Sequence, residues 1–156
     1  MDRRDFIVSA GTAALVGAAA SVGAAGSSFP RGTAASQKSQ GDTSRKAVID
    51  ACHDCMKTGE ACLAMCNEML RHGMTDLADC HARVVDMLTM CEATGKMAAT
   101  NTVPAARLKA LAGLCAETCR DCERACKPQA AKRAECKACM DDAAECAKAC
   151  ESYKAA

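Results

Sequence analysis

The spacing of its cysteines constrains the fold of this chain more than any other feature. The sequence holds 14 cysteines among 156 residues, and they recur at steps of three and four, as in Cys115, Cys119, Cys122 and Cys126. Residues that far apart lie on one face of an α-helix. Every cysteine falls on the inward face of its own segment, so the pattern predicts helices that turn their cysteines towards a shared core.

Start and stop signals divide the chain into four such helices. The predicted helices cover residues 43–72, 76–98, 104–127 and 130–153. Candidate N-caps of the first are Asp42, Thr43 and Ser44. Gly73 is expected to end it and Thr75 to cap the second, while Pro104 opens the third and Pro128 follows it. Short loops between helices of this length predict an all-α fold, an antiparallel up-down four-helix bundle with a cysteine-lined core.

The composition predicts that something other than aliphatic burial holds the C-terminal part of this chain in place. From Cys115 to the last residue there is no Leu, Ile, Val or Phe. A protonated cysteine can act as a small apolar residue, and a thiolate can act as a metal ligand. The formal net charge of +1 gives no reason to expect nucleic acid or an anionic membrane surface as a partner.

Thiols that line a core select soft metal ions, namely Cu(I), Zn(II) or the iron of iron–sulfur clusters. A continuous column of thiols favours Cu(I), which accepts two or three thiolates and tolerates bridging, at roughly one ion per cysteine. Equal numbers of Cu⁺ and thiolate charges also cancel inside an apolar core. The predicted ligands are Cys52, Cys55, Cys62, Cys66, Cys80, Cys91, Cys115, Cys119, Cys122, Cys126, Cys136, Cys139, Cys146 and Cys150.

A second group of candidate ligands lies where the first predicted helix ends and the second begins. It consists of Met65, Met69, His72 and Met74. Thioether and imidazole groups there are expected to bind Cu(I) weakly and pass it to the thiols. The alternative is that the methionines fill the core and that His72 is an exposed cation at a helix C-terminus.

The first residues are interpreted as an export signal rather than as part of the folded domain. The adjacent Arg3 and Arg4, with Phe6 after them, resemble a twin-arginine export signal, and a weakly apolar run follows over residues 7–20. That run is short for a membrane anchor, so stable membrane insertion is not expected. The predicted divisions are a signal peptide over 1–26, a flexible linker over 27–42 and the copper-binding bundle over 43–156. The protein is therefore expected to be periplasmic or otherwise exported.

Together these features resemble the bacterial copper storage protein family, over roughly residues 43–153. The resemblance rests on four helices, inward C-x-x-C and C-x-x-x-C pairs, the Met/His cluster over 65–72 and the export signal of the exported branch. It implies storage of many Cu(I) ions on the cysteines of the inward helix faces, without catalysis. It also implies supply to exported or membrane copper enzymes such as methane monooxygenase, or detoxification, and leaves a homo-oligomer open.

Other interpretations of the cysteines remain open from sequence. An even number of cysteines in an exported chain also suits a helical protein stapled by disulfides. A zinc-binding protein is the nearest metal-binding alternative. An iron–sulfur protein is a third, because the cysteines from 115 to 126 resemble a ferredoxin run, although their spacing departs from it. No motif for hydrolysis is present in the sequence, so an enzyme is not expected.

Overall fold

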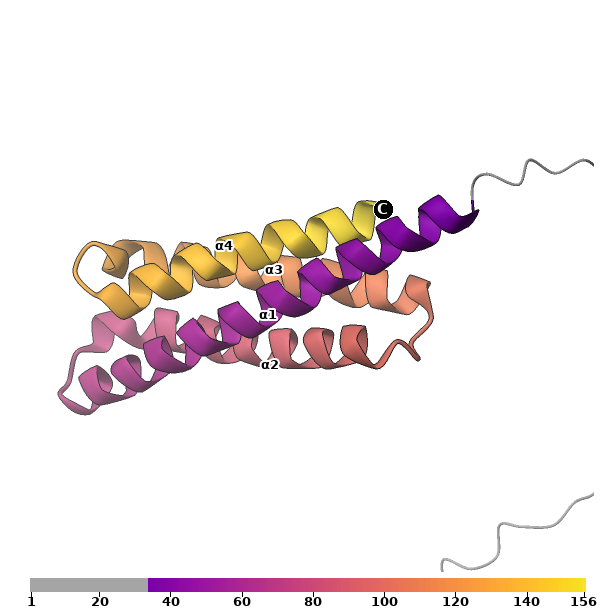
Figure 1. Cartoon of the computed structure of the whole chain (residues 1–156). Coiled ribbons are helices and arrows are strands. Elements are labelled where there is room, and N and C mark those ends of the chain that lie inside the picture. The colour runs from indigo at the N-terminus through magenta and orange to yellow at the C-terminus, as the bar shows by residue number, and fades with distance from the viewer. Residues whose placement is uncertain (1–33) are drawn as a thin grey trace, which may run out of the picture. The chain divides into compact units, whose positions relative to one another are not determined.

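The cysteine stripes lie on four long α-helices (Figure 1). The fold is that of a computed structural model, which describes residues 34–156, with side chains from residue 41 onward. The helices are α1 (Ala34–Arg71), α2 (Ala78–Thr100), α3 (Ala105–Ala130) and α4 (Ala134–Ala155), with a short 3₁₀ helix, η1 (Thr75–Leu77), ahead of α2. The predicted signal peptide lies outside the described residues. Within them the all-α prediction is confirmed.

The helices close a ring around one core. The pairs α1–α2, α2–α3, α3–α4 and α1–α4 pack side by side, so each helix has two neighbours (Figure 1). Short connections make consecutive helices antiparallel, as predicted. One end of the bundle therefore holds the α1–α2 and α3–α4 loops and is named the two-loop end. The opposite end holds the α2–α3 loop and the C-terminus and is named the one-loop end.

Polar contacts tie the loops together at each end. At the two-loop end, the Gln129 amide donates to Asp76 Oδ2 at 3.1 Å and to the Asp76 carbonyl at 3.3 Å. At the one-loop end, the Arg45 guanidinium donates to Asn101 Oδ1, which joins α1 to the α2–α3 loop. The Gln129 contacts place η1 against the end of α3, and so fix the start of α2.

The first helix begins earlier than the sequence predicts. It starts at Ala34 rather than at residue 43, so residues 34–42 of the predicted linker belong to α1. The proposed caps lie inside the helix, where the Ser44 hydroxyl donates back to the Gly41 carbonyl at 3.2 Å. The early start has a physical reason, because five of the nine residues from 34 to 42 are Ala, Gln or Lys, which favour a helix, and none is Pro.

The other helix ends differ from the predictions in detail. Thr75 begins η1 instead of capping α2, whose N-cap position is the buried Leu77, without a side-chain cap. Helix α3 begins after Pro104 and continues through Pro128 to residue 130, so α4 starts at residue 134. A proline near a helix C-terminus removes a single backbone hydrogen bond, and the last turn survives that loss.

Gly73 ends α1 as predicted. Its φ of +81° is in the left-handed region. The Met74 amide donates to the Met69 carbonyl at 3.1 Å and the Gly73 amide to the Leu70 carbonyl at 3.0 Å. These two bonds form a Schellman motif, which satisfies the last carbonyls of α1 and turns the chain towards η1.

Replacing Gly73 with Ala is expected to lower the free energy of unfolding by about 1 kcal/mol, because an L-residue is strained at this φ. Guanidinium unfolding of the reduced, metal-free protein measures the change. Gly41→Ala is the matched control, since Gly41 lies inside α1 with open space around its missing Cβ, and this change should be neutral or stabilising. Equal effects of the two substitutions would contradict the role assigned to Gly73.

The core has two chemically distinct parts along its length. At the one-loop end the buried residues are mainly apolar, and we name them the apolar plug: Val48, Ala98, Leu108, Ala112 and Tyr153. From there to the two-loop end the buried side chains are predominantly sulfur-bearing. None of the described helices combines the length and apolar character needed to span a membrane.

Candidate metal centre

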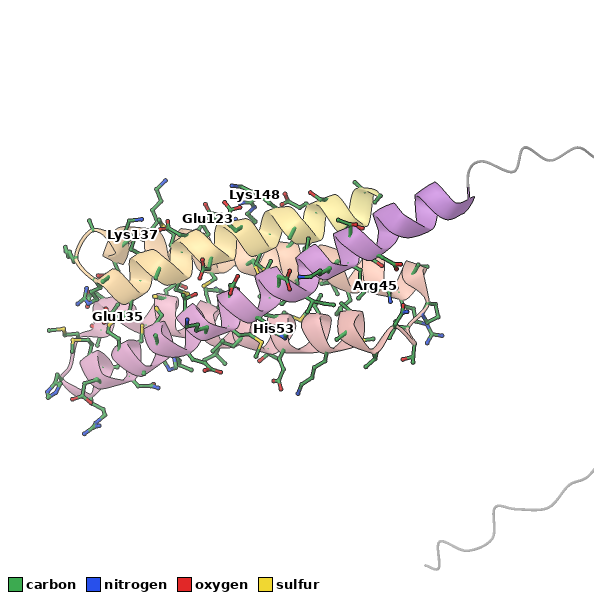
Figure 2. All side chains as sticks on the ribbon, in the orientation of Figure 1. Arg45, His53, Glu123, Glu135, Lys137 and Lys148 are labelled. Atoms are coloured by element: carbon green, nitrogen blue, oxygen red, sulfur yellow. The ribbon has the colours of Figure 1, made fainter. Side chains whose placement is uncertain are left out.

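All 14 cysteines are buried in the centre of the bundle. Each is at most 1% exposed, and all are free thiols. Helices α1, α3 and α4 each carry four of them, whereas α2 carries Cys80 and Cys91. Sulfur atoms, drawn in yellow, are visible between the ribbons in Figure 2. The structure therefore gathers every predicted thiol ligand into one column.

The thiols nearest the two-loop end form what we name the outer group. Its members are Cys62, Cys66, Cys80, Cys122, Cys126, Cys136 and Cys139. The Cys80 Sγ is central, at 3.3 Å from Cys126 Sγ, 3.8 Å from Cys66 Sγ and 3.9 Å from Cys62 Sγ. Two sets of three have all their sulfurs within 4.8 Å of one another, namely Cys62, Cys66 and Cys80, and Cys62, Cys126 and Cys139.

The remaining thiols form the inner group, which adjoins the apolar plug. Its members are Cys52, Cys55, Cys91, Cys115, Cys119, Cys146 and Cys150. The Cys91 Sγ lies 3.7 Å from Cys119 Sγ, 3.8 Å from Cys146 Sγ and 3.9 Å from Cys115 Sγ. Here two sets of four meet the same 4.8 Å limit, and Cys146 belongs to both.

These separations suit metal ions bridged by sulfur. A metal–thiolate bond is about 2.3 Å long, so one ion between two sulfurs needs them no more than about 4.6 Å apart. The close pairs of both groups, at 3.3–3.9 Å, meet that condition before any rearrangement. Each central sulfur also has several partners instead of one, which is unlike the paired arrangement of a disulfide scaffold.

Burial and mutual hydrogen bonding control the protonation of these thiols. Burial raises the pKa of Cys66 and of Cys136 above 9.0. Cys146 differs, because hydrogen bonds from its neighbours, that from Cys115 foremost, lower its pKa. Cys126 has a lowered pKa for the same reason, with Cys122 as its first donor. Most of the column is thus protonated at neutral pH, and a metal ion must displace protons to bind.

The metal-free protein is expected to lose stability as the pH rises. A thiol whose pKa is raised on folding stabilises the folded state fully below the unfolded pKa of 9.0, and this contribution is lost above it. The guanidinium midpoint of the reduced protein should therefore fall between about pH 8 and about pH 9.5. The double variant Cys66→Ala/Cys136→Ala should show a smaller fall. A midpoint that rises over this range would contradict the assignment.

The residues of the predicted Met/His cluster lie at the two-loop end, on the last turns of α1 and in the loop that follows it. Met65 and Met69 are half-buried and pack against the core. His72 is exposed and its Nε2 lies 2.9 Å from Glu68 Oε1. Met74 is 43% exposed, and its Sδ accepts a hydrogen bond from Arg133 at 3.6 Å. Their role as copper ligands stays a prediction.

Two histidines, His53 and His81, each follow a core cysteine in the sequence but lie at the surface of the bundle. His53 is exposed, and the Nε2 of His81 lies 2.9 Å from Asn67 Oδ1. Both positions fit solvated or surface-bonded imidazoles, the more common case for histidine.

Sequence reasoning overlooked two side chains within the column. The Met87 thioether accepts a hydrogen bond from the Cys55 thiol at 3.2 Å. Thr94 is fully buried, and its hydroxyl has no hydrogen-bond partner among the described residues. Both lie on the inward face of α2, so their positions were readable from the heptad pattern even though their contacts were not.

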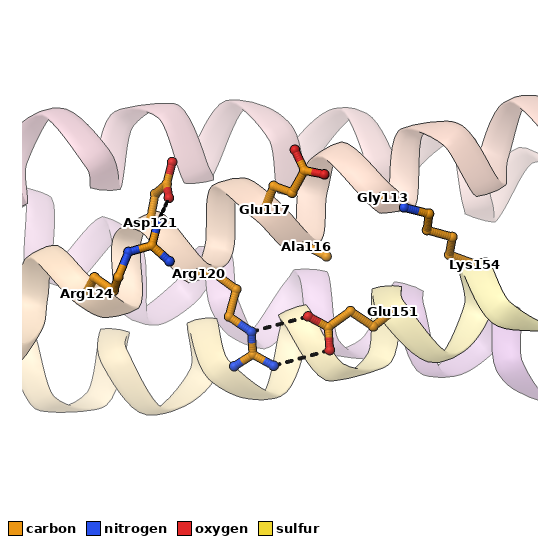
Figure 3. A pocket seen from close by; sticks show the side chains of 8 residues that line it. All are labelled: Gly113, Ala116, Glu117, Arg120, Asp121, Arg124, Glu151 and Lys154. Atoms are coloured by element: carbon orange, nitrogen blue, oxygen red, sulfur yellow. Dashed lines mark hydrogen bonds and ion pairs between the residues drawn. The ribbon is translucent and has the colours of Figure 1, made fainter.

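A surface pocket between α3 and α4 is chemically unrelated to the column. It is lined by Gly113, Ala116, Glu117, Arg120, Asp121, Arg124, Glu151 and Lys154 (Figure 3). Arg120 donates to both carboxylate oxygens of Glu151 at 3.3 Å. With paired charges and no sulfur in its lining, this pocket does not resemble a soft-metal site.

Comparison with known proteins agrees with this chemistry. The sequence profile of the copper storage protein family matches residues 41–155. A cytosolic copper storage protein from Streptomyces lividans, solved during loading with five coppers, superposes with a TM-score of 0.70 at 24% identity, over 76% of this chain and 98% of that one. The metal-free copper storage protein 3 of Bacillus subtilis gives 0.59 at 27% identity, over 70% and 97%. No curated protein matches significantly. On its profile match and its column of buried thiols, the chain belongs to the copper storage protein family.

Proposed function

We propose that the chain stores copper as Cu(I), at about one ion per cysteine, on the thiolates of the column. The observation that carries this proposal is the burial of all 14 thiols in two connected groups with sulfurs 3.3–3.9 Å apart. Such a column offers bridging sites along its whole length, unlike one closed site for a single ion.

The charge balance supports Cu(I) over divalent ions. A monovalent ion that replaces one thiol proton leaves the net charge of the core unchanged. A divalent ion at the same ratio would leave one uncompensated positive charge per site in a buried region, which is very costly. Storage on these terms needs no catalytic group, and we propose a non-enzymatic role.

We also propose that the protein acts outside the cytoplasm. The support is Arg3 and Arg4 in the export-like N-terminal segment. In the periplasm the stored copper would serve exported or membrane copper enzymes, of which methane monooxygenase is the example implied by the family resemblance. Fractionation of cells that express the full chain tests this, because Arg3→Lys/Arg4→Lys should keep the protein in the cytoplasm if the twin-arginine route is used.

An anaerobic titration of the fully reduced protein with Cu(I), in competition with a chromophoric chelator, tests the storage proposal. The expected endpoint is about one copper per cysteine. A matched titration with Zn(II) should saturate at far fewer ions, because zinc closes tetrahedral sites with four ligands. An endpoint of only a few Cu(I) ions would overturn storage and favour a discrete structural or transfer site.

A further inference from the structure

Helix α2 supplies fewer thiols to the column than any other helix. Its two cysteines, Cys80 in the outer group and Cys91 in the inner group, stand eleven residues apart. That separation is about 16 Å along the helix. Met87 lies on the same face between them, fully buried. Any contribution of α2 to the middle of the column therefore falls to Met87 and its neighbour on that face, Val84.

The sulfur of Met87 faces the column. Its Sδ lies 3.2 Å from the Sγ of Cys55, at the outer edge of the inner group. Along α1, Cys55 is the last cysteine of the inner group before Cys62, the first cysteine of the outer group. The Cys55–Met87 pair therefore stands at the junction of the two groups.

The neighbouring helix α1 makes room for this thioether. A Cβ on Gly59 of α1 would lie 2.6 Å from the terminal methyl carbon of Met87. The missing side chain at Gly59 thus lets the methyl group lie against α1 while the sulfur reaches Cys55. A leucine at position 87 would fill a similar volume but would offer no donor atom to a metal.

We propose that Met87 is a copper ligand, which with Cys55 completes a site that joins the outer and inner groups. This inference rests on the proposed Cu(I) storage. A thioether is a neutral soft ligand, so it raises the coordination of an ion without adding charge. When Cu⁺ binds there, Cys55 releases its proton to solvent and Met87 releases none, so the core stays neutral. The site gives ions a sulfur-lined step between the two halves of the column.

The first test compares two substitutions on the same helix. Met87→Leu removes the thioether with little change in volume, and Met90→Leu is its matched control, because Met90 is half-buried beside a surface groove with Asp86 and Thr118. Copper retained against a competing chelator is counted anaerobically on the reduced protein. Met87→Leu should retain about one ion fewer than the parent, and Met90→Leu the parental number. A parental count in Met87→Leu would overturn the proposal.

A second measurement needs no substitution, and so does not depend on the folding of a variant. The methyl groups of methionine are labelled with ¹³C, and the Met87 signal is assigned by its nuclear Overhauser contacts to Gly59. Addition of Cu(I) should shift this signal well beyond any shift of the Met90 methyl. A Met87 signal that stays in place while the thiols fill would overturn the ligand role. A parent protein that binds few ions would instead overturn the storage function itself.

Discussion

Loading with Cu(I) is expected to raise the melting temperature of the reduced protein by at least about 10 °C. A ligand that binds only the folded state adds about 2.7 kcal/mol per site at a hundredfold excess over its dissociation constant. One kcal/mol corresponds to at least roughly 2–4 °C for a chain of this size, so two filled sites already produce such a shift. Several filled sites should exceed it. Calorimetry under anaerobic, reducing conditions, with and without copper, measures the change.

Two controls make this thermal result specific. The same scan with copper and an excess of a strong Cu(I) chelator should show no copper effect, because the ions are withheld from the thiols. The scan should also depend on the amount of copper added, rising until the column is full. Equal melting temperatures for the metal-free and loaded proteins would contradict binding within the core.

Cys146→Ser is expected to lower the copper capacity by more than the single ion expected per cysteine. Cys146 belongs to both four-thiol sets of the inner group, and its Sγ lies 3.8 Å from Cys52 Sγ and from Cys91 Sγ. A serine hydroxyl is a poor ligand for a soft ion, so bridges in both sets are lost together. The expected capacity is lower by about two ions or more. Chelator competition on the reduced protein gives the count.

Cys136→Ser is the matched control for that variant. Cys136 belongs to none of the sets of three or four sulfurs within 4.8 Å of one another. Its Sγ lies 3.9 Å from the Sγ of Cys62. Its loss should cost about one ion. Circular dichroism should show intact helices in both variants, because a buried hydroxyl costs only about 1–3 kcal/mol. Equal losses of copper from the two variants would contradict the shared role of Cys146.

The inward face of each helix was predictable, because the spacing of the cysteines and their preference for a buried position indicate the same face. The three- and four-residue steps of Cys115, Cys119 and Cys122 are those of one helix face, and a cysteine on that face has the core as its natural place. Gly73 was predictable for a similar reason, since a glycine after a helical pattern commonly takes the left-handed conformation. The fold class and the thiol column follow from such local rules.

The contacts that depend on two helices at once were not predictable. The junction formed by Cys55 and Met87 requires the relative height of α1 and α2, which no single-helix pattern contains. The contact of Met74 with Arg133 is a similar case, because it joins the loop after α1 to the start of α4. Helix ends such as Ala34 and Pro128 depend on small propensity differences that packing overrides.

The apolar plug has a consequence for the order of events in the life of this protein. When the metal-binding thiols lie inside the core, the bundle must fold before the first ion binds. Val48 and Leu108, with Tyr153 beside them, bury apolar surface without any metal. This burial stabilises the four-helix bundle without copper, and folding then brings the thiols of the four helices close together. Copper can therefore be released and bound again without unfolding and refolding of the bundle.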